Sequence, residues 1–291
     1  MFSKFKKLND GHDLPLVGFG TGHIKAQSEV TRVVDNALKA GYRLFDSAAI
    51  YGNELELGIA FKELLPKHNL TRKDIYITSK LYEENHGGGK KTEDAVKTSL
   101  QKLQCEYVDL YLIHWPGVLG LSPSDPKNAT ERRKTWTTLV KLHKEGLLRS
   151  IGVSNYNLKH IKELVNDCDG VKPAVNQIEW HPHNHENALL DECRLHDILV
   201  QAHTPLGGTG NKALLDDPDV KNAAKELNVS PARILLRWLV QQDIAAIPKA
   251  TSYNHMVENT QLDFVIPDDV MTKLSNLTVQ SIYDLDRNTV V

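Results

Sequence analysis

The 291-residue chain lacks several features that would place it outside the ordinary globular class. It has only three cysteines, widely separated and with no CxxC pair, which predicts free buried thiols in a reducing compartment. No apolar run approaches the roughly 18 residues that cross a bilayer. The first residues, MFSKFKK, lack the apolar core of a signal peptide. These absences predict a cytoplasmic protein without membrane association.

Two further absences narrow the choice of partner and fold. The net charge is only -2 and no long basic or acidic run occurs, so the sequence does not predict a basic surface that would bind nucleic acid. The GxGxxG fingerprint of a dinucleotide-binding open sheet is also missing, because the first predicted strand leads into GFGTG at residues 18–22. The later run GGTG at 207–210 is followed by only a short segment. Flexible loops are the simpler interpretation of both runs.

A repeating pattern of strands and helices is what the sequence does contain. Eight short, mostly apolar runs alternate with segments in which apolar residues recur at three- and four-residue spacing. This pattern predicts a closed parallel (β/α)8 barrel, with a doubly wound open sheet as the rival fold. Thr92, followed by Glu93 and Asp94, is predicted to cap one helix. The predicted strands cover residues 16–19, 43–46, 75–79, 108–114, 150–153, 174–179, 199–203 and 245–247.

Polar residues at the ends of these strands are the candidates for chemistry, because barrel enzymes place their active sites at the carboxyl ends of the strands. Asp46, Lys80 and His114 end successive strands, and Tyr51 follows closely after the first of them. A phenol is neutral at pH 7 and can give a proton to a developing alkoxide. An adjacent ammonium favours the phenolate, a carboxylate balances that ammonium, and an imidazole can hold the substrate oxygen.

The same residues also have plainer interpretations. A single Asp, Tyr, Lys or His is usually structural or exposed, and only their common position at strand ends favours catalysis. The run HPHNH at 181–185 resembles a metal-ligand cluster, but no carboxylate or cysteine lies at zinc spacing from it. A surface loop or a capping role is therefore the prediction for this run, with no metal site. A catalytic cysteine is a further open alternative.

Seven motifs follow one another along the chain. They are LNDG (8–11), GYRLFDSAAIYGNE (41–54), ITSK (77–80), VDLYLIHWP (108–116), IGVSNY (151–156), NQIEWHP (176–182) and IPK (247–249). Together they resemble the motifs of the aldo-keto reductase superfamily, over residues 5–276. The resemblance implies a (β/α)8 TIM barrel of the NADP-linked oxidoreductase type, one domain across 1–291, with an N-terminal β-hairpin cap.

The resemblance implies reversible reduction of aldehydes and ketones to alcohols with NADPH. Asp46, Tyr51, Lys80 and His114 would be the catalytic tetrad, and Tyr51 would be the proton donor. The implied substrate contacts are His23, Tyr51, His114 and Trp115, joined by Val118 and Leu119. The implied cofactor contacts are Thr21, Gly22, Asp46, Ser154, Asn155, Gln177, His203, Thr204, Leu206, Gly207, Lys249, Ala250, Thr251, His255, Glu258 and Asn259.

The chain departs from the pattern of this family at several cofactor positions. His203 stands where a tyrosine usually stacks on the nicotinamide, Ala250 replaces a phosphate-proximal serine, and His255 replaces an arginine. Neutral imidazole cannot form a permanently charged bidentate clamp. Because Lys249 remains, NADP is still the predicted cofactor. His23 replaces a pocket tryptophan, and the short tail after residue 277 predicts an open pocket of broad specificity.

The predicted partner is a small-molecule carbonyl substrate, and the family resemblance predicts a monomer. Two other functions stay open on the sequence alone. The chain could be a non-enzymatic member of the same fold, or a different barrel enzyme such as an isomerase or a metal-dependent hydrolase. The intact set of four candidate residues favours the reductase.

Overall fold

The computed structural model describes residues 4–208, 210–277, 280–283 and 286–291; Thr209 and Thr278, named above within a glycine run and the tail, lie outside them. Eight parallel strands form one curled sheet in the order β10-β9-β8-β7-β6-β5-β4-β3. Val17 bridges Ala246 in parallel, and Gly18 N donates to Ala246 O (2.8 Å), so β3 and β10 meet as in a barrel. The strands are β3 (Phe19–Gly20), β4 (Leu44–Asp46), β5 (Tyr76–Leu81), β6 (Val108–Ile113), β7 (Leu148–Ser154), β8 (Val175–Glu179), β9 (Leu199–His203) and β10 (Ala245–Ala246).

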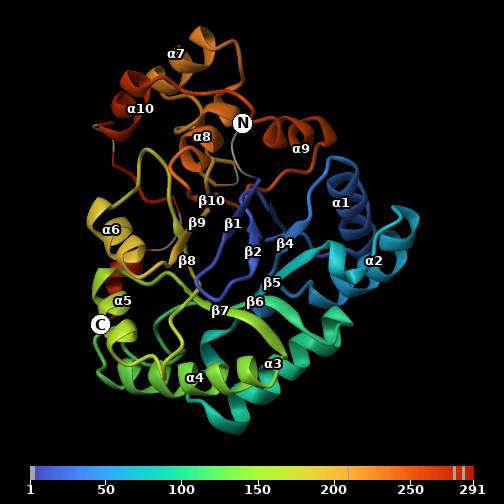
Figure 1. Cartoon of the computed structure of the whole chain (residues 1–291), viewed down its shortest axis with the longest axis vertical. Coiled ribbons are helices and arrows are strands. Elements are labelled where there is room, and N and C mark those ends of the chain that lie inside the picture. Colours follow the sequence, from blue (N-terminus) through green and yellow to red (C-terminus); the bar gives the residue numbers. More distant parts are fainter. Residues whose placement is uncertain (1–3, 209, 278–279, 284–285) are drawn as a thin grey trace.

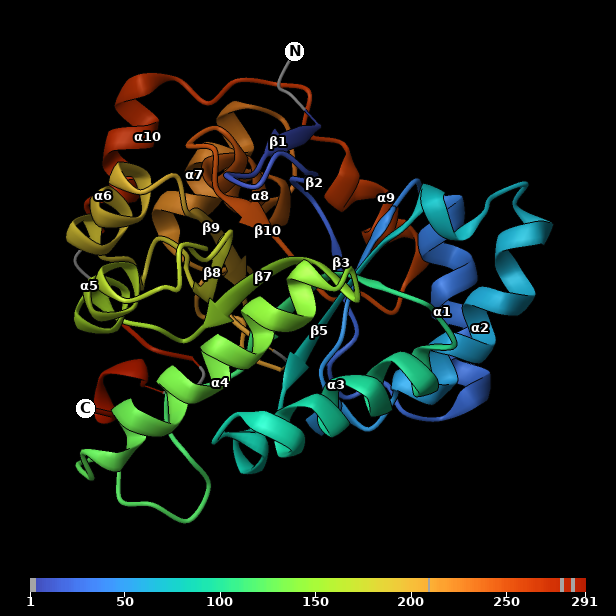
Figure 2. The same ribbon diagram turned by 60° about the horizontal axis from the view of Figure 1, so that its bottom comes forward.

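Helices surround this sheet, as Figure 1 and the turned view in Figure 2 show. Helix α1 turns an apolar stripe inward that includes Val30, Val33, Val34 and Ala37, all buried. The strands are buried on both faces, as parallel strands covered by helices must be. The helices are α1 (Gln27–Lys39), α2 (Glu54–Lys67), α3 (Gly89–Leu103), α4 (Lys127–Lys144), α5 (Leu158–Asn166), α6 (Asn187–Leu195), α7 (Pro218–Glu226), α8 (Pro231–Val240), α9 (Tyr253–Thr260) and α10 (Asp268–Ser275), with short 3-10 turns η1 (Ala49–Tyr51), η2 (Arg72–Asp74), η3 (Glu83–Asn85) and η4 (Arg287–Thr289).

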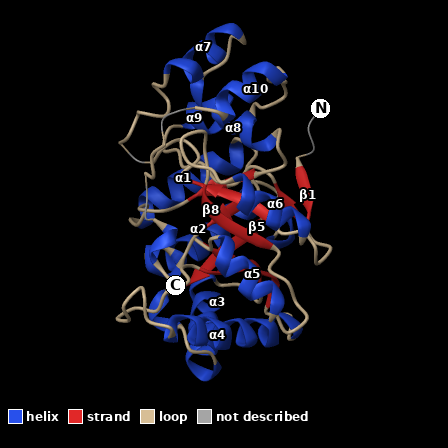
Figure 3. Ribbon diagram, turned by 90° about the vertical axis from the view of Figure 1, so that its left-hand side faces the viewer, coloured by secondary structure: helices blue, strands red, loops and turns tan. Residues whose placement is uncertain are grey.

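The predicted (β/α)8 fold and its N-terminal hairpin are confirmed. Strands β1 (Phe5–Lys7) and β2 (Asp13–Pro15) pair antiparallel and lie in front of the barrel in Figure 1. In Figure 3 the hairpin lies on one side of the sheet and long loops lie on the other. A cavity of about 340 Å³ lies under the hairpin, lined by residues at the starts of β5, β6 and β7. Within the described part of the chain, no helix combines the length and apolar character of a bilayer span.

The predicted cap of the third helix is wrong. Helix α3 begins at Gly89, and Gly88, four residues before Thr92, takes the N-cap position with φ +71°. Thr92 is buried, and its hydroxyl donates to Asn85 O (2.8 Å). A Cβ at Gly88 would come within 2.5 Å of Lys134 O, so only glycine allows this turn to pack against α4.

Candidate active site

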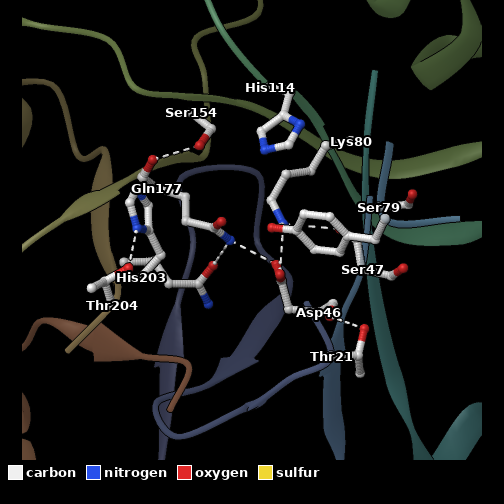
Figure 4. A network of polar contacts seen from close by, with 12 residues as sticks. Thr21, Asp46, Ser47, Ser79, Lys80, His114, Ser154, Gln177, His203 and Thr204 are labelled. Atoms are coloured by element: carbon white, nitrogen blue, oxygen red, sulfur yellow. Dashed lines mark hydrogen bonds and ion pairs between the residues drawn. The ribbon is translucent and has the colours of Figure 1, made fainter. Parts of the chain in front are cut away.

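Six strands deliver polar side chains to one end of the barrel, shown in Figure 4. Asp46 ends β4, Lys80 lies near the end of β5, and His114 follows β6 directly. Ser154 ends β7 and His203 ends β9, while Gln177 lies within β8. Because the strands are parallel, all their carboxyl ends face the same mouth. The structure thus brings the predicted strand-end residues Asp46, Lys80 and His114 together with Ser154, Gln177 and His203, which the family resemblance implies as cofactor contacts.

Lys80 is the central group of this site. Its ammonium lies 2.5 Å from Asp46 Oδ1, 2.9 Å from the carbonyl oxygen of Ser47 and 3.5 Å from the phenol oxygen of Tyr51. The Lys80 and Asp46 side chains are 0% and 2% exposed. Burial lowers the pKa of Lys80, but the charges and hydrogen bonds of Asp46 and Tyr51 outweigh it, so the pKa is raised from 10.5. Lys80 is therefore a buried ammonium at neutral pH.

The second carboxylate oxygen of Asp46 links the Lys80 ammonium to two glutamines on β8 and β9. Gln177 Nε2 donates to Asp46 Oδ2 (2.7 Å) and also to Gln201 Oε1 (2.8 Å). Both N–H groups of Gln177 are thus committed, and its amide oxygen is left to accept a hydrogen bond. An amide N–H of a ligand, such as that of a nicotinamide carboxamide, fits this acceptor.

Tyr51 is held by the short turn that follows β4. It ends η1, and Gly52 follows with φ +66° in the left-handed region. Asn53, which the sequence interpretation missed, is fully buried and fixes this turn: its amide oxygen accepts from Ser47 Oγ (2.7 Å) and its nitrogen donates to Ile24 O (2.9 Å). The ammonium of Lys80 lies 5.0 Å from the centre of the Tyr51 ring.

His114 forms the other side of the site. Its ring lies 5.8 Å from the Tyr51 ring at 81°, and Figure 4 shows it beside Lys80. Burial, followed by the charges of Lys80 and His203, holds the pKa of His114 well below 6.5. Its Nδ1 is buried without a hydrogen-bond partner among the described residues. The imidazole is therefore neutral at pH 7 and has one nitrogen that carries a proton.

Asn155, His203 and Thr204 border the site next to Gln177. Asn155 and Thr204 have positive φ values of +62° and +52°. Asn155 Nδ2 donates to His114 O (2.9 Å), and its amide oxygen lies 3.1 Å from His203 Nε2. His203 Nδ1 lies 3.1 Å from Thr204 Oγ1. Ser154 Oγ donates to Gln177 O (2.7 Å). These five predicted cofactor contacts, from Ser154 to Thr204, are thus neighbours in space.

A second group of predicted cofactor residues lies where the chain passes from β10 into α9. Lys249 Nζ donates to Gly22 O (3.2 Å), while Thr21 is buried and donates to Asp46 O (2.8 Å). Ala250 and Asn259 are buried, whereas Thr251 and His255 are exposed and Glu258 is half-buried. The predicted cofactor contacts Thr204, Leu206 and Gly207 follow β9 directly, and Gly207 has φ +87°.

Arg32 is a cation at this place that the sequence interpretation missed. It lies on α1, and its Nη1 donates to the carbonyl oxygen of Thr251 (3.1 Å). This contact holds a permanent positive charge beside the first turn of α9, where the backbone N–H groups favour an anion. No signal in the sequence could have found it, because a polar residue on the outer face of an amphipathic helix is ordinary.

The predicted substrate contacts lie around the mouth. His23 is exposed with φ +66°. The backbone next to it passes close to Tyr51, because a Cβ atom added to Gly22 would lie 3.8 Å from the Tyr51 ring. Trp115 is half-buried, and a Cβ at Gly117 would meet its Cδ1 at 3.4 Å and Val290 at 3.2 Å. Val118 is half-buried and Leu119 is exposed. Although the tail is short, its last residues therefore reach the substrate side.

The prediction of a surface loop at 181–185 is wrong. His181 and His183 are 0% and 2% exposed. His181 Nε2 lies 2.8 Å from Glu179 Oε1, and His183 Nε2 lies 3.0 Å from Asp217 Oδ2. Asp217 is 34 positions away in the chain, so local spacing could not reveal this pair. No group of three or more potential metal ligands was found in the portion of the chain that the structure describes.

The cysteines do not contribute to the site. All three are free; Cys193 is buried, whereas Cys105 and Cys168 are half-buried. Burial raises the pKa of the Cys193 thiol to about 12 and also raises the pKa of Cys105. A thiol with a raised pKa is a poor nucleophile at neutral pH, so neither is suited to catalysis.

Comparisons with known proteins agree with this architecture. The family model described as "Aldo/keto reductase family" matches residues 16–278. A glyoxal reductase of Bacillus subtilis (strain 168) is 37% identical, covering 93% of this chain and 91% of its own length. An NADP-dependent D-sorbitol-6-phosphate dehydrogenase of Malus domestica is 36% identical, covering 96% and 93%. The structure of an aldose reductase from Schistosoma japonicum matches with a TM-score of 0.87 at 33% identity, covering 96% and 94%.

Proposed function

The chain belongs to the aldo/keto reductase family, and on that premise we propose that it reduces aldehydes and ketones to alcohols with NADPH, with Tyr51 as the proton donor. The observation that carries this proposal is the buried ammonium of Lys80, which lies 2.5 Å from Asp46 and 3.5 Å from the Tyr51 phenol. A bound reduced nicotinamide supplies the two electrons and the hydrogen that the carbonyl carbon takes up.

The side chains around Lys80 divide the remaining work. As the carbonyl oxygen becomes an alkoxide, the Tyr51 phenol gives it a proton, and the Lys80 ammonium stabilises the phenolate that remains. Asp46 keeps Lys80 charged. The neutral imidazole of His114 donates a hydrogen bond to the same oxygen and orients the carbonyl. In the reverse direction the Tyr51 phenolate accepts the proton from the alcohol.

The residues next to this site are suited to hold a nicotinamide. The free amide oxygen of Gln177 would accept from the carboxamide N–H, with Ser154 and Asn155 beside it. The half-buried ring of His203 would lie against the nicotinamide face, over a smaller area than a tyrosine would cover. Thr204, Leu206 and Gly207 would follow the pyrophosphate, and Thr21 and Gly22 the nicotinamide ribose.

The preference for NADPH over NADH is supported by two cations near the start of α9. Lys249 lies there, and Arg32 donates to Thr251 O. Either can meet a 2′-phosphate, which offsets the missing arginine at His255. Thr251 would also lie at the 2′-phosphate, and Glu258 and Asn259 would lie at the adenine. The NADP-dependent dehydrogenase of Malus domestica, which shares 36% of its residues, also supports this cofactor.

The proposed substrates are small carbonyl compounds that enter between His23, Trp115 and the loop after β6. The relatives named above act on different compounds, so their names do not fix one substrate for this chain. We also infer, from the family resemblance, one domain that acts as a monomer, and, from the three free cysteines, a reducing compartment such as the cytoplasm.

The test is an NADPH-oxidation assay of the purified protein against a panel of aldehydes, ketosteroids, sugars and quinones. We expect turnover of at least one class and a lower Michaelis constant for NADPH than for NADH. Binding of NADPH without turnover on any carbonyl would favour a non-enzymatic role. Activity that needs a divalent cation and ignores nicotinamide would indicate another barrel enzyme.

A further inference from the structure

Tyr283, in the tail after α10, enters a cluster built by the chain that follows β8. Its backbone N–H donates to Glu179 Oε1 (2.7 Å), and its phenol oxygen lies 2.7 Å from His183 Nδ1. Its ring lies 5.1 Å from the His181 ring, tilted by 31°. The N–H of Ser281 donates to His183 O (2.8 Å). The tail is therefore attached here by both backbone and side-chain contacts.

His183 extends this attachment to helix α7. Its Nε2 lies 3.0 Å from Asp217 Oδ2, and both side chains are buried. The other oxygen of Asp217 accepts from the backbone N–H groups of Asp219 (2.8 Å) and Val220 (3.3 Å), which caps α7. A chain of hydrogen bonds thus runs from Tyr283 through His183 and Asp217 to the start of α7.

Tyr283 also lies against the start of the loop that ends at this cap. We call residues 204–217, apart from 209, the β9–α7 loop. A Cβ at Gly207 would come 3.6 Å from two carbons of the Tyr283 ring, and one at Gly208 would come 3.9 Å from Tyr283 O. Tyr283 therefore holds the beginning of the loop through packing and its end through His183 and Asp217.

We propose that Tyr283 is a positioning residue that latches the β9–α7 loop and slows the release of the nicotinamide cofactor. The inference rests on the proposed function, in which Thr204, Leu206 and Gly207 lie along the pyrophosphate. The contacts of Tyr283 are with Glu179, His181, His183 and Gly207, none of which is assigned to proton transfer. The latch therefore acts on cofactor dissociation and leaves the chemical step unchanged.

The chemistry of the cluster fits a latch better than a second catalytic site. A hydroxyl, an imidazole and a carboxylate in sequence are also the parts of an activated nucleophile. Here burial raises the pKa of the Tyr283 phenol, and nearby Glu179 and Asp217 raise it further against the opposing Ser281 hydrogen bond. A phenol that keeps its proton is a hydrogen-bond donor rather than a nucleophile.

The test measures the rate at which NADPH leaves the full-length protein, by stopped-flow fluorescence after mixing with excess NADP. Tyr283→Phe keeps the ring but loses the hydrogen bond to His183, so we expect release to be about two- to tenfold faster. Tyr283→Ala also loses the contacts with His181 and Gly207, and release should be faster still. In a single turnover with bound NADPH and saturating aldehyde, both variants should react at the wild-type rate.

Tyr107→Phe is the matched control, because it also removes one phenol hydroxyl. That hydroxyl is buried without a hydrogen-bond partner among the described residues. Arg72 and Arg149 lie over the Tyr107 ring, just before β6 and so near the other end of the barrel. The Tyr107→Phe variant should release NADPH at the wild-type rate. If Tyr283→Ala binds and oxidises NADPH but releases it no faster than the wild type, the latch is wrong while the proposed function stands. If the wild type binds no NADPH, the proposed function fails and the latch with it.

Discussion

Replacing Asp46 by asparagine tests whether this carboxylate is what keeps Lys80 charged. The substitution leaves a fully buried ammonium with the carbonyl of Ser47 at 2.9 Å but without a counter-ion. Removing one partner of a buried ion pair costs about 3–5 kcal/mol, so Asp46→Asn should lose that much stability at pH 7. Urea unfolding followed by circular dichroism measures the loss.

The pH dependence of the same measurement is the sharper test. In the wild type the pKa of Lys80 is raised above 10.5, so the stability it contributes is complete below pH 10.5 and is lost only as the pH rises through the folded-state value. In Asp46→Asn, burial is no longer outweighed and should push the pKa of Lys80 below 10.5. Between that lowered pKa and 10.5, the unfolded chain then binds one more proton at Lys80 than the folded chain. The free energy of unfolding should therefore increase with rising pH in this range, by up to about 1.4 kcal/mol per pH unit.

Asp109→Asn provides the control. Asp109 is 3% exposed and pairs with Arg72 (2.6 Å) and Arg149 (3.2 Å), so its loss should also destabilise the protein. Arginine keeps its proton throughout this range, so no new slope should appear between pH 7 and 10. If the curve of Asp46→Asn runs parallel to that of the wild type, the assigned dependence of Lys80 on Asp46 is refuted.

Three further predictions follow from the same contacts. Lys80→Met should lower the rate of NADPH-dependent reduction by at least about 100-fold, because the phenolate loses its ammonium; a rate near wild type would contradict this role. Arg32→Ala should raise the Michaelis constant for NADPH about tenfold and leave that for NADH unchanged, whereas Lys39→Ala at the far end of α1 should change neither. Burial lowers the pKa of His86 to about 4 from 6.5, so the unfolded chain binds the extra proton between these values and stability should fall by roughly 3 kcal/mol as the pH drops from 6.5 to 4. His86→Gln should remove most of that loss in urea titrations, and an unchanged slope would exclude His86 as its source.

The strand ends were predictable because their signal is local. Each buried parallel strand is a short apolar run, and the polar residue that ends it is next to it in the sequence, as with Asp46 after Leu44 and Phe45. The topology then fixes that all these ends meet. The long motif around Tyr51 is also contiguous, so the turn that carries this phenol could be expected from the sequence.

The contacts that were missed join distant parts of the chain. Asp217 meets His183, Arg32 meets Thr251 and Tyr283 meets Glu179, and no spacing rule links such positions. The buried cluster at 181–185 was mistaken for a surface loop for the same reason, because its partners follow much later in the sequence.

The central claim is that Tyr51 gives the carbonyl its proton, and the most direct test is a single turnover of Tyr51→Phe. NADPH bound to this variant is mixed with an aldehyde that the wild type reduces, and cofactor oxidation is followed by absorbance. We predict that NADPH binds with the wild-type dissociation constant while oxidation slows by at least about 100-fold. Oxidation at the wild-type rate would contradict the account.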